Sequence, residues 1–198
     1  MRLAFAVLLP VFAANLWAED WPRWRGLRGD GTWQAPALSD KWPEDGLKRL
    51  WKRSVSPGFS GVSVAGGRVF LMDRPDKEKH GETERVVCFS ADSGETLWSY
   101  SYEAEYGDLD YGNGPRASVT VRAGKVYGLG AVGHVFCLDA KTGKQFWMRD
   151  LVKEEKARLP TWGFSAAPES YDELMLYHVG AQPTGSVLAL DANTGQTR

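Results

Sequence analysis

The stretch Val135–Trp147, which reads VFCLDAKTGKQFW, decides the fold because it recurs along the chain. Val86–Trp98 reads VVCFSADSGETLW, and Val187–Arg198 reads VLALDANTGQTR. Aligned on the glycine of their shared turn, the copies are 49 and 52 residues apart. A period of this length is typical of repeat proteins, in which each unit buries its faces against its neighbours.

Each copy lies in a unit of about 50 residues that contains short apolar strands separated by glycine turns. The strands we expect are 60–64, 68–72, 86–89 and 96–100, then 117–121, 125–129, 133–138 and 144–147, then 163–168, 174–178 and 186–190. Four antiparallel strands joined by local hairpins are typical of a β-propeller blade. The sequence therefore predicts an all-β chain whose residues 47–198 form about three four-stranded blades.

Leu47–Val55 alternates apolar and basic residues and is predicted to be a further strand. Trp51 precedes Trp98 by 47 residues, close to the repeat period, so it is interpreted as the last-strand tryptophan of another blade. Closed propellers have about 4–8 blades. We therefore expect an N-terminal fragment of a seven- or eight-bladed ring, with Trp51 in the blade that joins both chain ends.

The residues of the recurring turn are interpreted as structural, because they recur in every unit whereas catalysis is usually done once. Aspartate and threonine can bond backbone N–H groups, glycine allows positive φ, and a tryptophan can wedge between blades. In the first copy, Ser90 and Ser93 replace the aspartate and threonine, so we expect that turn to lack both caps. The structural set is Trp51, Asp92, Gly94, Trp98, Asp139, Thr142, Gly143, Trp147, Asp191, Thr194 and Gly195.

Residues 137–147, CLDAKTGKQFW, resemble the tryptophan-docking repeat of the quinoprotein alcohol dehydrogenase-like propellers, also called PQQ-like repeat proteins. The third copy matches the same pattern as far as Gly195, and the resemblance covers roughly residues 47–198. The family includes non-catalytic scaffolds such as BamB of outer-membrane barrel assembly, and PQQ-dependent dehydrogenases. The resemblance therefore specifies the fold much more strongly than the function.

The resemblance first implies an exported, non-catalytic binding or scaffold module, including a role in envelope protein assembly. Its partners would be other envelope or secreted proteins, and it would need no cofactor. The alternatives are an alcohol or sugar dehydrogenase that uses PQQ and Ca²⁺, or a ligand sensor. Under the dehydrogenase alternative, a carboxylate acts as base, Ca²⁺ polarises the quinone and an arginine pairs with the cofactor.

The most site-like stretch is the tyrosine-rich, acidic segment Tyr100–Arg116. Acidic and aromatic side chains on one loop suit Ca²⁺ or a sugar-like ligand, although a solvated inter-blade loop is the simpler interpretation. The histidines and cysteines lack metal-ligand spacing, and no catalytic residue is assigned. The candidate ligand-loop residues are Asp108, Asp110, Asn113, Arg116 and, in the equivalent loop of the third unit, Trp162.

Residues 1–18 are predicted to be a signal peptide, with Arg2 before an apolar run that is too short to span a bilayer. No cysteine lies near the expected cleavage point, so we expect a periplasmic or secreted protein without a lipid anchor or a transmembrane segment. The formal net charge of −1 provides no basic field for nucleic acid.

Residues 19–46 are predicted to be an N-terminal arm, rich in tryptophan and arginine. The arm either packs across the main domain or presents an exposed binding surface. Asp73–Arg85 is highly charged and is expected to be a solvated, mobile loop. Cys88 and Cys137 occupy equivalent repeat positions about one sheet spacing apart, so we expect two free, buried thiols.

Overall fold

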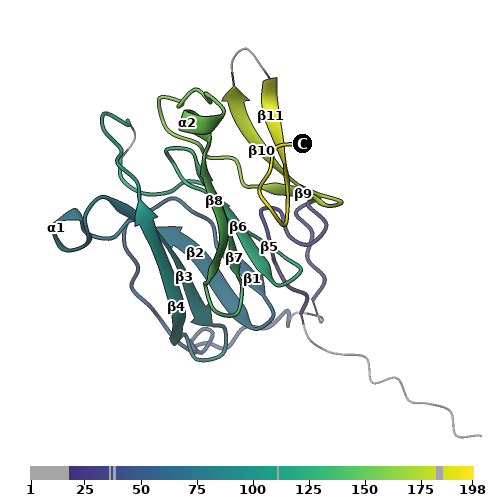
Figure 1. Cartoon of the computed structure of the whole chain (residues 1–198). Coiled ribbons are helices and arrows are strands. Elements are labelled where there is room, and N and C mark those ends of the chain that lie inside the picture. Colours follow the sequence, from purple (N-terminus) through teal and green to yellow (C-terminus); the bar gives the residue numbers. More distant parts are fainter. Residues whose placement is uncertain (1–17, 36, 38, 111, 182–184) are drawn as a thin grey trace, which may run out of the picture.

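A computed structural model describes residues 18–35, 37, 39–110, 112–181 and 185–198 (Figure 1). The predicted signal peptide, apart from Ala18, lies outside the described residues, and so does Tyr111. In the described part of the chain, the helices are too short and too polar for any of them to cross a membrane.

Three antiparallel sheets stand side by side, and they confirm the predicted propeller architecture (Figure 1). The first has the order β1-β2-β3-β4, the second β5-β6-β7-β8, and the third β11-β10-β9. The strands of the first sheet are β1 (Ser63–Ala65), β2 (Arg68–Asp73), β3 (Thr83–Ser90) and β4 (Thr96–Glu103). Those of the second are β5 (Thr120–Arg122), β6 (Lys125–Leu129), β7 (His134–Asp139) and β8 (Gln145–Asp150). Those of the third are β9 (Glu169–Tyr171), β10 (Leu174–Ala181) and β11 (Gly185–Asp191).

Two of the strand predictions are wrong. The third sheet begins at β9 (Glu169–Tyr171) rather than within residues 163–168, and no strand forms over Leu47–Val55. Alternation alone does not make a strand, because the extended backbone needs a hydrogen-bonded neighbour. Among the described residues, no backbone hydrogen bond joins Leu47–Val55 to another segment.

Each docking tryptophan lies on the turn glycine of the next sheet, not of its own. A Cβ on Gly143 would lie 2.6 Å from the ring of Trp98, and a Cβ on Gly195 would lie 2.8 Å from the ring of Trp147. Trp98 Nε1 donates to Ala140 O at 3.2 Å. Trp147 Nε1 donates the equivalent hydrogen bond to Ala192 O, in the third turn, at 3.2 Å. The large rings therefore couple successive blades, and the absent side chain of glycine makes room for them.

The turn caps follow the sequence pattern closely. Asp139 Oδ1 accepts hydrogen bonds from the backbone N–H and the hydroxyl of Thr142, at 2.8 and 2.7 Å. These bonds lower the pKa of Asp139, those from Thr142 being the main cause. Asp191 Oδ1 accepts from the backbone N–H of Thr194 at 2.9 Å. The aspartates thus hold the turns in the manner of Asx turns.

The first turn lacks the aspartate and threonine caps, as expected, but two serines take their place. Ser93 N–H donates to Ser90 Oγ at 3.3 Å, and Glu95 N–H donates to Ser93 Oγ at 3.3 Å. A serine hydroxyl can accept the same bond as a carboxylate, only more weakly. In the aligned repeats, Ser90 rather than Asp92 is equivalent to Asp139. Asp92 is equivalent to Lys141 and is exposed.

The hydrophobic core lies between the sheets rather than inside any one of them. One cluster joins the first two sheets and includes Phe70, Trp98 and Phe136. A second joins the last two sheets and includes Tyr127, Trp147 and Tyr177. A blade face is covered only by its neighbour, so burial follows the stacking of blades.

The charged segment Asp73–Arg85 is only partly the solvated loop that we expected, because its exposed residues are confined to positions 76–81. It contains the helix α1 (Lys77–His80) and the start of β3, and Asp73 is fully buried. The Asp73 carboxylate accepts two hydrogen bonds from Arg85, at 2.9 and 2.6 Å, and one from Ser56 N–H at 2.8 Å. Buried charges require such partners, and a linear sequence does not reveal them.

The arm crosses the first strand of every sheet. Trp21 exchanges two backbone hydrogen bonds with Val64 in β1, at 2.9 and 2.8 Å. Pro22 O accepts from Val121 N–H in β5 at 2.7 Å, and Arg23 forms an ion pair with Glu169 in β9. The arm's backbone therefore packs on the domain, while Trp24 stays 60% exposed.

A further short helix, α2 (Leu151–Glu154), follows β8. Cys88 and Cys137 are free and buried. Burial raises the pKa of each thiol to about 11.

We expect neither cysteine to react with a thiol reagent in the native protein at about pH 8, because only the thiolate is nucleophilic. Reactivity should appear in step with unfolding in denaturant. Absorbance with a chromogenic disulfide reagent measures it, with the fully unfolded chain as the control for two titratable thiols. Rapid labelling of native protein would contradict the burial of both groups.

Candidate functional site

Three loops that precede the first strands of the sheets come together on one face of the molecule. Phe59, Arg116 and Ser165 each lie four residues before their strand, β1, β5 or β9. Phe59 N–H donates to Pro115 O at 2.8 Å, and Asp110 N–H donates to Thr161 O at 3.2 Å. The blade repeat therefore gathers side chains that are 57 and 49 residues apart in sequence.

Arg116 is the residue that ties these loops together. Within the described chain, its guanidinium donates four hydrogen bonds to backbone carbonyls: Trp162 O at 2.9 Å, Asp110 O at 3.2 Å, Gly112 O at 3.1 Å, and Gly114 O. The guanidinium carbon also lies 5.4 Å from the ring centroid of Tyr106 and 5.7 Å from that of Phe59. The planar guanidinium has five N–H donors, and the bonds to these loop carbonyls use four of them. This arginine therefore mainly orders the loops.

The candidate ligand-loop residues do not form one site. Arg116 and Trp162 line the same cavity, but Asn113 lines a different one, beside Arg74 and Tyr106. Asp108 and Asp110 line neither cavity. Across the described chain, no three His, Cys, Asp or Glu side chains are placed to hold a metal ion.

Within the described chain, these residues do not by themselves assemble the PQQ and Ca²⁺ site of the dehydrogenase alternative. Calcium needs several converging oxygen ligands, and Asp108 and Asp110 do not line the cavity beside Arg116. The arginine that would pair with the cofactor instead donates to four backbone carbonyls. We therefore derive no redox step from this site.

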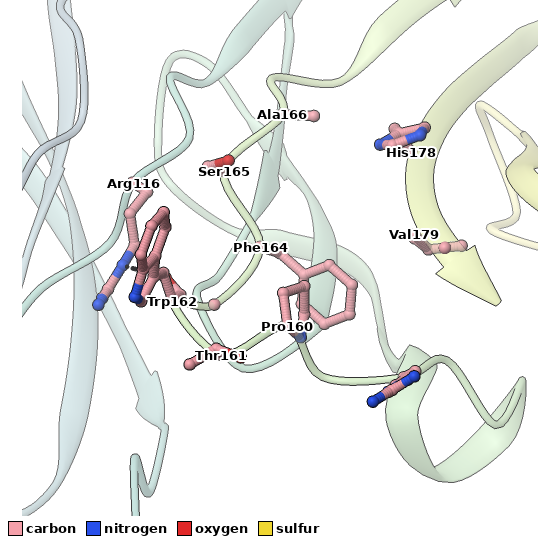
Figure 2. A pocket seen from close by; sticks show the side chains of 12 residues that line it. Arg116, Pro160, Thr161, Trp162, Phe164, Ser165, Ala166, His178 and Val179 are labelled. Carbon is pink, nitrogen blue, oxygen red and sulfur yellow. Dashed lines mark hydrogen bonds between the residues drawn. The ribbon is translucent and has the colours of Figure 1, made fainter. Parts of the chain in front are cut away.

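The cavity beside Arg116 has a volume of about 760 Å³ and is lined mainly by apolar atoms. Figure 2 shows Arg116 and Trp162 on one side, Pro160 and Phe164 in the middle, and His178 with Val179 across the opening on β10. Phe164 is anchored because its N–H donates to Ala131 O at 2.8 Å. Arg158 adds a second, exposed cation to the lining.

A second cavity of about 450 Å³ extends the same face toward the arm. It shares Arg116, Ser165 and Ala166 with the first cavity and adds Trp24 and Phe59. Trp24, Phe59 and Trp162 are 60%, 51% and 63% exposed. We call the face made by these three aromatics, Arg116 and Arg158 the aromatic face.

Sequence reasoning identified Trp162 and Arg116 but missed Phe59 and Arg158 as their neighbours. Phe59 is signalled by its position four residues before β1, which matches that of Arg116 before β5. Aligning the loops that precede each unit, rather than the turns alone, would have found it. Arg158 carries no comparable signal, because its place depends on how the chain after α2 folds back.

A further buried site that the sequence did not reveal surrounds Glu84, which is fully buried in β3. Its carboxylate accepts hydrogen bonds from the phenols of Tyr102 and Tyr106, the latter at 2.5 Å, and from Ala131 N–H at 3.0 Å. Burial, followed by the Glu84 charge, raises the pKa of both phenols, so they remain donors. Because Ala131 lies in the turn between β6 and β7 of the second sheet, this carboxylate joins two blades.

The comparisons with known proteins agree with this architecture. A family model described as the outer membrane protein assembly factor BamB matches residues 82–198, more than half of the chain. No curated protein sequence matches the chain.

Among solved structures, the quinohemoprotein alcohol dehydrogenase from Comamonas testosteroni is 19% identical, with a TM-score of 0.61 over 90% of this chain and 26% of that one. A europium-containing methanol dehydrogenase is 18% identical, with a TM-score of 0.53 over 73% of this chain and 24% of that one. BamB from Moraxella catarrhalis is 22% identical, with a TM-score of 0.49 over 75% of this chain and 38% of that one.

The chain thus spans about a quarter of the length of the two dehydrogenases, and at these identities the likeness shows the fold alone. The family match rests on the segment that contains all three copies of the repeated turn. This chain belongs to the PQQ-like β-propeller family whose model is described as the outer membrane protein assembly factor BamB.

Proposed function

We propose that this chain is a non-catalytic, exported propeller module that binds other envelope or secreted proteins, with a role in envelope protein assembly. The aromatic face is the observation that carries the proposal. Exposed tryptophan and phenylalanine beside arginine form the kind of surface from which proteins build binding hot spots. Three large aromatics at 51–63% exposure are more than isolated surface residues, because they border two adjoining cavities.

The chemistry of the face favours an extended polypeptide that carries apolar and acidic side chains. The cavity of about 760 Å³ is lined mostly by apolar atoms, and Arg158 at its edge is exposed. An apolar side chain would enter the cavity while an acidic one pairs with the arginine. The matched family is described as an outer membrane protein assembly factor, and the strands of outer-membrane barrels alternate apolar and polar residues in this way.

We expect the double variant Phe59→Ala, Trp162→Ala to bind such a peptide at least about tenfold more weakly than the unmodified chain, since truncated hot-spot aromatics cost about 2 kcal/mol or more. The probe is a fluorescein-labelled peptide that alternates leucine or tyrosine with polar residues and contains two glutamates. Fluorescence anisotropy measures its Kd.

Trp42→Ala is the matched control, because Trp42 is 66% exposed but lines neither cavity of the aromatic face. Equal affinities for all three proteins would contradict binding at this face. Dye reduction with an alcohol or sugar after addition of PQQ and Ca²⁺ would contradict the non-catalytic assignment.

A further inference from the structure

The two interfaces between blades use equivalent residues, and a comparison of them shows one charge that is not matched. Arg68 and Lys125 are equivalent, since each begins the second strand of its blade, β2 or β6. Between the last two blades, Lys125 Nζ donates to Asn193 Oδ1, in the third turn, at 2.6 Å. The residue equivalent to Asn193 in the second turn is Lys141. The interface between the first two blades therefore has two cations where the other has a donor and its acceptor.

The chain itself does not fully satisfy the guanidinium of Arg68. Its Nη1 donates to Gly66 O at 3.1 Å, whereas Nε is buried and, among the described residues, has no acceptor. Buried donors in folded proteins nearly always have a partner, so such a group calls for an explanation. On the planar fork, Nε and Nη2 form one edge, to which a carboxylate can bind with both of its oxygens.

A cavity of about 600 Å³ lies beside this guanidinium, between the first two blades and the arm. Its volume is in the range of small-molecule sites, and apolar atoms make up most of its lining. The charged residues that line it are Arg68, Arg122, Lys141, Asp20 and Asp139. Arg122 also donates from Nη1 to Asp172 O, which leaves its other N–H groups for the cavity.

Both carboxylates of the lining already accept hydrogen bonds from the chain. Asp20 Oδ2 accepts from Gly66 N–H at 3.0 Å. Asp139 Oδ1 caps its own turn and accepts from Lys141 N–H at 3.1 Å. Because three cations line the cavity with these two carboxylates, one positive charge is in excess.

The arm forms an apolar wall of this cavity. Pro22 and Leu27 line it, and Leu27 is 51% exposed. Pro22 O fixes this wall by accepting from Val121 N–H, at 2.7 Å, and Val121 lines the cavity as well. The turn residues Ala123 and Ala140 add further apolar surface. A ligand that fills the cavity therefore needs an apolar body as well as a negative charge.

We propose that this cavity binds a small organic carboxylate whose apolar group packs against the arm. The carboxylate accepts from the Nε edge of Arg68 and pairs with Lys141, so it replaces the acceptor that Asn193 provides at the next interface. One excess positive charge matches a singly charged carboxylate better than a phosphate monoester, which carries almost two negative charges. The two cavities of the aromatic face share no lining residue with this one.

Phenylacetate is the probe for this site, and phenylacetamide, which has nearly the same shape without the charge, is the matched control ligand. We expect an NMR titration of the ¹⁵N-labelled chain to give at least about tenfold tighter binding of phenylacetate, because charge-assisted hydrogen bonds are about twice as strong as neutral ones. Failure of phenylacetate to bind, or equal affinity for the two ligands, would overturn the proposal.

Lys141→Asn is the sharper test, because it copies the third turn and lets the chain itself provide an acceptor to Arg68. We expect this variant to bind phenylacetate at least about tenfold more weakly, since hydrogen bonds between charged groups are the strong ones. Lys144→Asn is the control: Lys144 is exposed in the same turn but does not line the cavity, so the affinity should change less than about twofold. Equal affinities of these two variants would contradict the site.

The double variant of the aromatic face distinguishes this site from the proposed peptide-binding surface. It should bind phenylacetate as tightly as the unmodified chain does, because none of its altered residues lines the cavity beside Arg68. Loss of phenylacetate binding in that variant, with binding retained in Lys141→Asn, would place the ligand on the aromatic face and overturn the proposal.

Discussion

Replacing Gly143 with alanine is expected to lower the free energy of unfolding by about 3 kcal/mol, although the substitution adds a single methyl group. Gly143 has φ +72°, where an alanine costs about 1–2 kcal/mol. The new Cβ would also lie 2.6 Å from the ring of Trp98, and overpacking costs about 1–3 kcal/mol. The ring must move, which weakens the coupling between the first two blades.

Gly124→Ala separates the two contributions. Gly124 has φ +73° but no heavy atom within 4 Å of an added Cβ, so its replacement should cost only the backbone term of about 1–2 kcal/mol. Urea unfolding monitored by tryptophan fluorescence measures both variants. If both variants lost the same free energy of unfolding, the contact between Gly143 and Trp98 would add nothing to the cost of the positive φ. The proposed docking of Trp98 on this glycine would then be contradicted.

Replacing Glu84 with alanine is expected to lower the free energy of unfolding by about 3–5 kcal/mol, the cost of removing one partner of a buried charged network. The phenols of Tyr102 and Tyr106 and the N–H of Ala131 would all lose their acceptor in a site that water does not reach. Each unsatisfied buried donor costs about 1–3 kcal/mol.

Glu84→Gln should show an intermediate loss, because the amide keeps one acceptor oxygen while its NH₂ faces a donor. Glu78→Ala is the control: Glu78 is exposed in α1, and its replacement should change stability by less than about 0.5 kcal/mol. Urea unfolding at neutral pH compares the three variants. A loss for Glu84→Ala no larger than that for Glu78→Ala would show that the buried network is not a stabilising link between blades.

The candidate site was only partly predictable from the sequence. Arg116 and Trp162 stood out because of their residue types, and they do line one cavity. Asp108 and Asp110 looked equally promising, yet they do not line that cavity, because a loop of mixed acidic and aromatic residues does not reveal which side chains turn inward. The guanidinium of Arg116 could have faced a ligand, but the fold instead surrounds it with four backbone carbonyls.

The sequence by itself determined the features that neighbouring residues control. These are the glycine turns with positive φ, the alternating strands on either side of them, and the tryptophan four residues after each of Gly94 and Gly143. They were predictable because turn geometry and alternation depend on bonds and contacts within about ten residues. The blade repeat and the family resemblance both follow from them.

Only the tertiary structure decided which distant groups meet. Trp51 docks on a turn 43 residues further along, and the Glu84 carboxylate reaches Ala131 across 47 residues. The same holds for the missing strand at Leu47–Val55, where an alternating pattern found no partner. Local sequence specifies which groups can bond, but burial and pairing depend on what the rest of the chain brings beside them.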